Sequence, residues 1–236
     1  MIAAIIPARG GSKRIPRKNV RPFCGKPLLA YPITAARESG LFDTVVVSTD
    51  DADIAATARA WGAETPFVRP ARLADDHAPT QPVLDHAVDW LTANRGPVAT
   101  YCALYANPFT TAETIRRGFA LLTSDPHALV VMGVTDFGYP IQRALRQTAD
   151  GRLEYLYPEH ALTRSQDLEP AFHDAAQFYW HDLPAIAAAK ARGEAVRARP
   201  LFIPRHLCQD IDTPEDWAVA ERLYTAFFTD AAKAGP

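Results

Sequence analysis

The sequence predicts an α/β fold built on a mostly parallel sheet. Short β-branched runs alternate with helical patterns through the first half of the 236 residues, as is typical of right-handed βαβ units. The length suits one domain with a sizeable core, so residues 1–236 are predicted to form a single domain. From about residue 137 to 182 aromatic and polar residues mix without a clean period, which indicates a small inserted arm.

The predicted helices and strands follow from runs of apolar residues and from the turn-forming residues that bound them. A buried strand over 2–6 comes first, and a helix over 27–37 is closed by Gly40. Further strands are predicted over 44–48, 64–68, 99–105, 128–134 and 196–203. Further helices are predicted over 52–61, 81–93, 111–123, 183–192 and 214–228. Thr213 can cap the last helix, with Pro214 at its first position and Asp216 in its first turn. Because ligands bind at the carboxyl ends of parallel strands, the loops after these strands are the places to expect function.

The bulk composition disfavours several classes of function. A formal net charge of −2 argues against wholesale binding to nucleic acids or membranes. Cys24, Cys102 and Cys208 are widely separated and lack paired ligand spacing, so we expect reduced thiols in a cytoplasmic protein. The apolar start is too short for a signal h-region, and no run has the length of a transmembrane helix.

A basic loop, PARGGSKRIPRKNVR at residues 7–21, follows the first strand, and no acidic residue precedes Glu38. Gly10 and Gly11 allow positive φ and close backbone approach, so we expect their N–H groups to form an anion-binding nest. Ser12 adds a hydroxyl donor. The alternative is a solvated basic surface loop. Phosphate binding is favoured by Gly-Gly-Ser at the end of strand one, although neither a Walker A loop nor G-x-G-x-x-G is present.

The segment IPARGGSKRIPRKN resembles the N-terminal signature of the CMP-sugar synthetases, which activate sialic, pseudaminic and legionaminic acids. The resemblance covers nearly the whole chain. It implies a doubly wound α/β domain of the nucleotide-diphospho-sugar transferase type, forming a homodimer with a protruding arm. It also implies that CTP is contacted by residues of the basic loop, namely Arg9, Gly10, Gly11, Ser12, Lys13, Lys18 and Asn19.

Among these, the resemblance implies that Lys18 or Lys13 stabilises charge on the α-phosphate and the departing pyrophosphate, and Arg9 is a further catalytic candidate. Arg69 and Thr80 match family positions near the base and ribose. For Arg69, an ordinary surface arginine after a strand is an equal alternative.

A carboxylate pair, Asp210 and Asp212, lies just before the predicted last helix in CQDIDTPEDW. In an extended segment both side chains point to the same side, so both can face one cation, and Mg²⁺ needs one or two carboxylates plus phosphate oxygens. The alternative role of Asp212 is helix capping, for which Thr213 is already available. The resemblance favours Mg²⁺ binding by the pair and a catalytic role for Asp212.

The arm is expected to select the acceptor sugar. An acidic nine-carbon sugar carries a carboxylate and therefore requires a cation, for which Arg143 and Arg164 are the candidates. Gln177 and Tyr179 can hydrogen-bond its acylamino groups or hydroxyls. The alternatives are core or dimer packing for the aromatic residues and interface salt bridges for the arginines.

Two segments depart from the sialic acid type of the family. Residues 104–108 read Leu-Tyr-Ala-Asn-Pro in place of Gln-Pro-Thr-Ser-Pro, and residues 173–176 read His-Asp-Ala-Ala in place of Arg-Pro-Asn-Gly. The replacements resemble the pseudaminic acid branch. Ala176 stands where that branch usually has glycine, which indicates a local adjustment of the backbone.

Other chemistries have little support. The seven histidines show no zinc-ligand spacing, and no G-x-S-x-G elbow is present. Asp75-Asp76-His77 is interpreted as a surface turn. RNA binding would need aromatic residues among the loop cations, and residues 8–21 contain none.

The sequence thus predicts a Mg²⁺-dependent transfer of CMP from CTP to the anomeric hydroxyl of a nonulosonic acid, with pseudaminic acid favoured. Sialic acid, legionaminic acid and Kdo are the alternative acceptors, and a CTP-sensing regulatory module is the non-enzymatic alternative. No residue is assigned as the general base.

Overall fold

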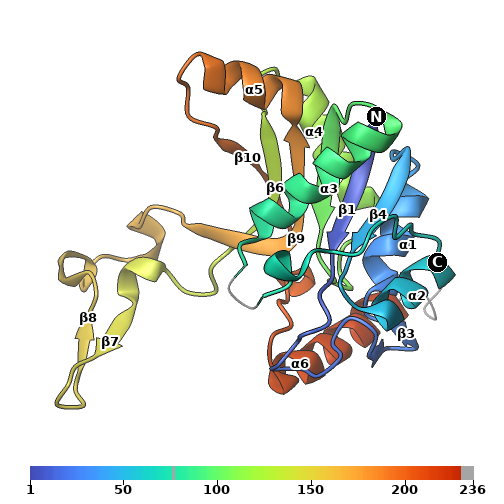
Figure 1. Cartoon of the computed structure of the whole chain (residues 1–236). Helices are drawn as coiled ribbons and strands as arrows, with labels where there is room; N and C mark the ends of the chain where they lie inside the picture. Colours follow the sequence, from blue (N-terminus) through green and yellow to red (C-terminus); the bar gives the residue numbers. More distant parts are fainter. Residues whose placement is uncertain (76–77, 230–236) are drawn as a thin grey trace, which may run out of the picture.

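A central sheet organises the molecule, and helices cover both of its faces (Figure 1). The computed structural model describes residues 1–75 and 78–229. Within them the sheet has six strands, in the spatial order β10 (Ala198–Phe202), β6 (Val130–Asp136), β9 (Phe172–Asp182), β5 (Thr100–Leu104), β1 (Ile2–Pro7) and β4 (Thr44–Ser48). Neighbouring strands are parallel except at β9, which is antiparallel to both β5 and β6. The predicted mostly parallel α/β sheet is confirmed.

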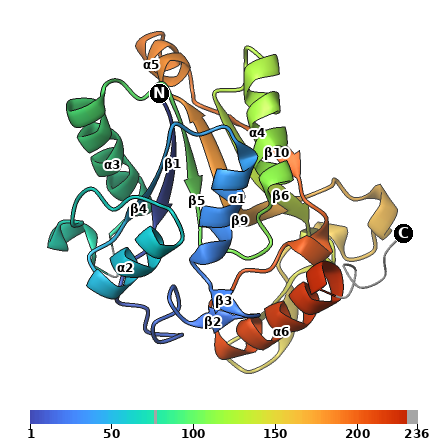
Figure 2. The same cartoon turned by 90° about the vertical axis from the view of Figure 1, so that its right-hand side faces the viewer.

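The side chains of β1 alternate between two cores, because successive residues of a strand face opposite sides of the sheet. Ala4 and Ile6 belong to one core, together with residues of the helices on that side: α1 (Ala30–Ser39), α2 (Ala52–Ala60) and α4 (Ala112–Ser124). Ala3 and Ile5 belong to the other, together with α3 (Thr80–Arg95). Figure 2 shows α3 and α4 on opposite sides of the sheet. This two-sided covering is the predicted doubly wound arrangement. The helix α5 (Leu183–Ala191) follows β9 directly.

A third apolar cluster lies beside the carboxyl end of the sheet. It joins Ile15 of the basic loop to Phe23 of the short β2 (Pro22–Phe23) and β3 (Lys26–Pro27) hairpin. It also contains Ile211 and Trp217, the latter from α6 (Pro214–Tyr224). This shared core therefore fixes the basic loop to the segment that carries the carboxylate pair, although the two lie near opposite ends of the sequence.

The predicted cap of the last helix is confirmed. Thr213 accepts a hydrogen bond from the Asp216 N–H (3.1 Å) and Pro214 occupies the first turn, so α6 starts where the sequence indicates. The Asp216 carboxylate in turn accepts hydrogen bonds from the N–H groups of Thr213 (2.8 Å) and Asp212 (3.1 Å). Capping of α6 therefore does not require the side chain of Asp212.

One predicted strand is wrong. Residues 64–68 form only an isolated parallel bridge between Glu64 and Val46. Pro66 lacks an N–H and cannot donate to a sheet ladder, which explains why the pairing stops after Glu64.

The arm projects from the sheet between β6 and β9 (Figure 1). It contains the hairpin of β7 (Leu145–Gln147) and β8 (Leu153–Tyr155) and single helical turns at Ile141–Arg143, Pro158–His160 and Ser165–Asp167. Because β9 pairs within the central sheet, the projecting part ends before residue 172, whereas the sequence suggests an arm reaching about residue 182. We refer to residues 137–171 as the arm.

The backbone is irregular where the arm rejoins the sheet. The register of β9 against β6 shifts between Met132 and Val134, and Ala176 adopts a left-handed conformation with φ of 50°. The Ala176 N–H donates a hydrogen bond to Asp174 Oδ1 (2.8 Å). A glycine would adopt this conformation without strain, which gives the physical basis for the adjustment expected at Ala176.

In the described part of the chain, none of the helices has both the length and the apolar character needed to cross a lipid bilayer.

Candidate active site

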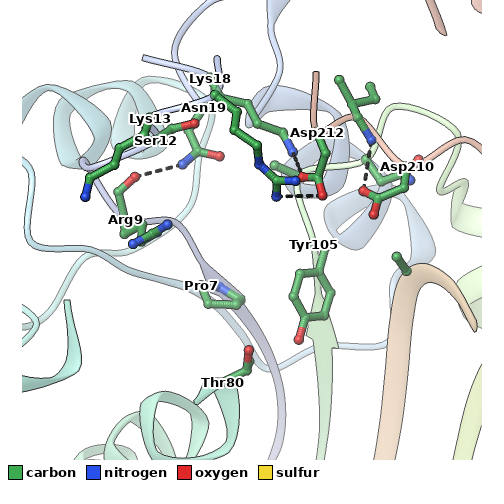
Figure 3. A pocket seen from close by; sticks show the side chains of 15 residues that line it. Pro7, Arg9, Ser12, Lys13, Lys18, Asn19, Thr80, Tyr105, Asp210 and Asp212 are labelled. Carbon is green, nitrogen blue, oxygen red and sulfur yellow. Dashed lines mark hydrogen bonds and ion pairs between the residues drawn. The ribbon is translucent and has the colours of Figure 1, made fainter. Parts of the chain in front are cut away.

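A cavity of about 720 Å³ opens at the carboxyl ends of β1 and β5. It is lined by the basic loop on one side and by the carboxylate pair on another (Figure 3). The lining residues are Pro7, Arg9, Ser12, Lys13, Arg14, Lys18, Asn19, Thr80, Tyr105, Ala106, Asn107, Ala176, Asp210, Ile211 and Asp212. The cavity thus lies where ligands bind in sheets of this type.

The basic loop is fixed at two points. Ile15 is 1% exposed within the third cluster, so the middle of the loop is anchored by apolar contacts. The Asn19 amide donates a hydrogen bond to the Arg9 carbonyl (3.1 Å) across the loop, and the Asn19 carbonyl accepts from the Leu29 N–H (2.9 Å). The structure therefore brings Arg9, Ser12, Lys13, Lys18 and Asn19 into one cavity wall.

Gly10 and Gly11 do not adopt the backbone conformation of the predicted anion-binding nest. Neither Gly10 nor Gly11 has positive φ, so the nest conformation expected from the sequence is wrong. The Gly10 N–H donates to Asp50 Oδ1 (3.1 Å). A Cβ at Gly10 would lie 2.9 Å from Asp51 Cβ, so this glycine allows close packing of the loop against the segment after β4.

The charge of the basic loop is partly balanced within the protein. The Arg17 guanidinium donates to Asp51 Oδ2 (3.1 Å) and Asp53 Oδ2 (2.7 Å), at the start of α2. Arg14 and Lys18 both reach Asp212, with N–O distances of 2.7 Å and 3.6 Å. The sequence shows the loop cations without acidic neighbours, but the fold supplies carboxylates from two distant segments.

Arg69 is buried, not an ordinary surface residue. It is 5% exposed, its Nε donates to Ser48 Oγ (3.2 Å), and its Nη2 donates to the Ser48 carbonyl. Burial and nearby Arg9 lower the pKa of Arg69, while Asp50 opposes this shift. Arg69 lines a second hollow with Asp50 and Asp75, whereas Thr80 lines the main cavity. The remainder of the Asp75-Asp76-His77 cluster lies outside the described residues.

Both members of the carboxylate pair line the cavity, together with Ile211 between them. Ile211 is 2% exposed and belongs to the third cluster, and both Asp210 and Asp212 line the cavity. Both carboxylates are therefore found at one cavity wall, as the spacing predicts, and Ile211 anchors the segment in the third cluster. Figure 3 shows them opposite the loop cations.

The carboxylate pair fits a magnesium ion. Burial, and then the charge of Asp212, raise the pKa of Asp210, so the site favours a positive charge beside this carboxylate. Two carboxylates, completed by phosphate oxygens and water, are a usual donor set for Mg²⁺. Among the described residues no group of three or more His, Cys, Asp and Glu side chains could hold a metal alone. Phosphate oxygens of a substrate and water would complete the coordination of an ion held by this pair.

None of the four residues predicted to bind the sugar, Arg143, Arg164, Gln177 and Tyr179, is among those that line the cavity. Arg143 and Arg164 lie in the arm and do not line it; Arg143 donates to the Thr163 carbonyl and Arg164 pairs with Asp167 (2.6 Å). Gln177 is fully buried, and its Nε2 donates to the Leu207 carbonyl (2.6 Å).

Tyr179 lies behind the cavity wall. Its ring makes an edge-to-face contact with Tyr105, which lines the cavity, at a centroid distance of 5.4 Å. Its hydroxyl donates to Asp174 Oδ2. Burial, followed by the Asp174 hydrogen bond, raises the pKa of Tyr179 well above its ordinary value, so this tyrosine remains a neutral donor.

Sequence reasoning did not assign several cavity residues to the site, among them Arg14, Tyr105 and Asn107. Arg14 was counted among the loop cations but not assigned to the site, and Tyr105 and Asn107 were used only to compare sugar types. The signal that could have identified the last two is their position directly after a buried strand, in a loop expected to carry function.

Comparisons with known proteins show which family this chain resembles over most of its length. The family described as Cytidylyltransferase matches residues 3–194. Pseudaminic acid cytidylyltransferase of Campylobacter jejuni is 38% identical over 221 residues, covering 93% of this chain and 94% of that protein. CMP-N,N'-diacetyllegionaminic acid synthase of Legionella pneumophila is 31% identical over 233 residues, covering 94% of this chain and 95% of that protein.

Among solved structures, CMP:2-keto-3-deoxy-manno-octonic acid synthetase complexed with CTP is similar with a TM-score of 0.65. The match covers 95% of this chain and 98% of that chain at 17% sequence identity. At this identity the likeness establishes the fold of the nucleotide-diphospho-sugar transferases and no more.

Proposed function

This chain belongs to the cytidylyltransferase family, and from that premise we propose that it transfers CMP from CTP to a nonulosonic acid, with pseudaminic acid as its acceptor. The observation that carries the proposal is the cavity in which Arg9, Lys13, Arg14 and Lys18 face the carboxylate pair. Four cations suit a triphosphate, and two carboxylates suit the metal ion that accompanies it.

In the proposed reaction the anomeric hydroxyl oxygen attacks the α-phosphorus of CTP in line. A new bond forms between that oxygen and the α-phosphorus, the bond to the bridging oxygen of the β-phosphate breaks, and pyrophosphate leaves while the hydroxyl proton is released. Lys18, Lys13 and Arg9 bind phosphate oxygens and stabilise the charge that moves to the leaving group. Catalysis then consists mainly of positioning and charge stabilisation.

Asp210 and Asp212 are proposed to hold Mg²⁺, which when bound supplies further neutralisation of the triphosphate charge. In this state Asp212 would exchange its contacts with Arg14 and Lys18 for the metal, and both cations would become available to phosphate. Arg69 and Thr80 are proposed to contact the base and ribose, from the second hollow and the main cavity respectively.

The choice of pseudaminic acid rests on the relatives. The cytidylyltransferase of C. jejuni named for this sugar is 38% identical over 93% of the chain, against 31% for the legionaminic acid enzyme. The same segments that depart from the sialic acid type, residues 104–108 and 173–176, border this cavity through Tyr105, Asn107 and Ala176.

The arm is proposed to form the interface of a homodimer. Large apolar side chains gather on it, with Leu162 97%, Tyr139 88% and Leu153 68% exposed, and such surfaces commonly mark contacts between chains. A dimer would also give Arg143 and Arg164 a route to a sugar, since in their own chain neither lines the cavity. We place the protein in the cytoplasm, in keeping with three free cysteines.

The direct test is pyrophosphate release with CTP, Mg²⁺ and a panel of pseudaminic, legionaminic, sialic and 3-deoxy-manno-octulosonic acids. We expect pseudaminic acid to give a kcat/KM at least about tenfold above the others, which is about 1.4 kcal/mol of transition-state discrimination. Activity with another acid alone would overturn the acceptor and leave nucleotidyl transfer intact. CTP binding without pyrophosphate release, with any acid, would instead support a CTP-sensing module.

A further inference from the structure

The chain segment that leads into the carboxylate pair is tied down at three consecutive residues. The Leu207 carbonyl accepts a hydrogen bond from Gln177 Nε2 (2.6 Å), and the Gln209 carbonyl accepts one from Asn107 Nδ2 (3.1 Å). Between them, Cys208 Sγ donates to the Ala175 carbonyl (3.8 Å). We refer to residues 207–209 as the lead segment. It has no regular secondary structure after residue 207, so these contacts replace the backbone hydrogen bonds that a strand would make within a sheet.

The two residues whose amides hold the lead segment are buried and have further hydrogen bonds of their own, although Gln177 Oε1 has no partner within the described residues. Gln177 is 0% exposed on β9, and its own carbonyl accepts from the Tyr105 N–H (3.1 Å). Asn107 is 4% exposed, and its Oδ1 accepts from the Phe109 N–H (2.9 Å). The donors are thereby fixed to β9 and to the loop after β5, and they hold the lead segment from two different elements of the fold.

The position of the carboxylate pair depends on this anchoring. Asp210 and Asp212 carry like charges that repel each other, so a loose segment would separate them when no cation lies between them. On one side the pair is fixed by buried Ile211 and by the cap of α6. Arg14 and Lys18 also pair with Asp212. On the side of Asp210, the contacts of the lead segment hold the chain one residue before the pair.

We propose that Asn107 and Gln177 are positioning residues that hold the carboxylate pair in the geometry required for the metal ion. The inference rests on the function proposed above and assigns Gln177 a contact with the lead segment in place of a contact with sugar. Residues that orient metal ligands through hydrogen bonds commonly change metal affinity by about 10- to 100-fold when they are replaced.

The experiment compares Gln177→Leu and Asn107→Ser with Thr110→Val. Leucine fills much of the volume of Gln177 without a donor, and serine keeps a short acceptor for the Phe109 N–H but cannot reach Gln209. Thr110 is a matched control: it is 4% exposed, three residues beyond Asn107, and its hydroxyl has no hydrogen-bond partner within the described residues. If Gln177→Leu does not fold, the proposal is tested on Asn107→Ser alone.

Two readouts are measured. The first is the Mg²⁺ concentration that gives the half-maximal rate of pyrophosphate release, and the second is Mn²⁺ binding to the CTP-bound protein by electron paramagnetic resonance. We expect both test variants to require about 10- to 100-fold more metal, with partial recovery of kcat at saturating Mg²⁺ and metal-free CTP binding within about twofold of the parent chain. Thr110→Val should match the parent in both readouts.

Folded test variants whose metal requirement equals that of the parent would overturn the proposal. A merely structural role would lower thermal stability and the active fraction, yet leave the half-maximal Mg²⁺ concentration unchanged. If the parent chain releases no pyrophosphate, the proposed function fails, but the Mn²⁺ readout still decides the positioning role.

Discussion

The wall of the active-site cavity and the arm are held in opposite ways. The cavity wall is assembled from segments far apart in sequence, joined through buried Ile15, Ile211 and Trp217 and through long-range hydrogen bonds to residues 207–209. The arm contacts mainly itself: Arg143 bonds to Thr163 and Arg146 to Glu154. Most of its large apolar side chains are exposed, whereas Ile15 and Ile211 beside the cavity are buried.

The difference indicates which binding residues are brought together within one chain. One chain places cations, carboxylates and the residues that support them around the cavity, so we expect nucleotide binding to require no second chain. The arm has side chains of the type that bind sugars and partners, but its arginines Arg143 and Arg164 do not line the active-site cavity. We therefore expect replacements at the cavity to act within one chain, and replacements in the arm to act through association.

The largest effect is expected at Asp212. Asp212→Asn should lower kcat for pyrophosphate release by about a thousandfold, because one of two metal-binding carboxylates is lost. Metal-free CTP should bind several-fold more tightly, since Arg14 and Lys18 lose an internal competitor for phosphate. Calorimetric titration with CTP in chelator measures the second effect.

Glu194→Gln is the control for Asp212→Asn. It removes a comparably short ion pair, 2.7 Å from Arg192, in the turn after α5 and away from the cavity. Its activity should stay within about twofold of the parent, since exposed pairs contribute little. Near-normal turnover of Asp212→Asn with Mg²⁺ would contradict the metal assignment.

The second-largest effect concerns the pH dependence of folding stability, which we expect to involve a histidine of the central sheet. His181 of β9 stacks on Tyr101 with ring centroids 4.5 Å apart, and burial lowers the pKa of His181 to about 4, with Asp85 opposing the shift. The unfolded chain, with a pKa near 6.5, therefore takes up the proton first as pH falls. The folded state has its full stability above about pH 6.5 and loses up to about 3 kcal/mol as pH falls towards 4.

His181→Phe keeps a ring against Tyr101 and removes the titration. Urea unfolding at several pH values should show a shallower fall in stability between pH 6.5 and 4 for this variant, and the pair compared at pH 8 gives the pH-independent packing difference. Identical slopes in the two proteins would show that His181 does not titrate as a buried residue.

The third effect distinguishes the arm from the cavity. Leu162 is 97% exposed, and burying a leucine contributes about 1.5 to 3 kcal/mol. If the arm forms a dimer, Leu162→Ser should weaken association by at least about tenfold in analytical ultracentrifugation. Val219→Ser, at a partly exposed apolar position of α6, is the comparison outside the arm.

Turnover should then fall with dilution for Leu162→Ser while CTP affinity is kept, since the cavity is complete in one chain. A parent chain that sediments as a monomer, or a variant that associates as strongly as the parent, would exclude the arm as the dimer interface.

The long-range contacts of the cavity wall also explain which features could be predicted from the sequence and which could not. The carboxylate pair was predictable because alternation about an apolar Ile211 is a local property of the chain. The anchors Asn107 and Gln177 were not, because their partners lie 102 and 30 residues away and no local pattern records the pairing. Similarly, the acidic partners of Arg17 come from the segment after β4, which only the parallel pairing of β1 and β4 brings near.

The boundary of the arm was difficult for a physical reason. Beyond Ala176, β9 alternates normally, with Phe178 and Trp180 in one core and Tyr179 against the other. The shifted register near Ala176 interrupts this period, so the first half of the strand does not look like part of a sheet.

The smallest expected effect is at this junction of arm and sheet. Ala176 has φ of 50°, a conformation that costs an L-residue about 1 to 2 kcal/mol. Glycine would relieve this strain, but part of the stabilisation is lost because glycine gives the unfolded chain more conformational freedom. Ala176→Gly should therefore raise the free energy of unfolding by about 0.5 to 1 kcal/mol in urea titrations. The neighbouring Ala175→Gly should lower it by about 1 to 2 kcal/mol, because Ala175 is 1% exposed and has no positive φ. Opposite signs at adjacent alanines would show that the strained turn, and not the composition of the segment, limits stability where the arm leaves the sheet; destabilisation at both would show that Ala176 is held without strain.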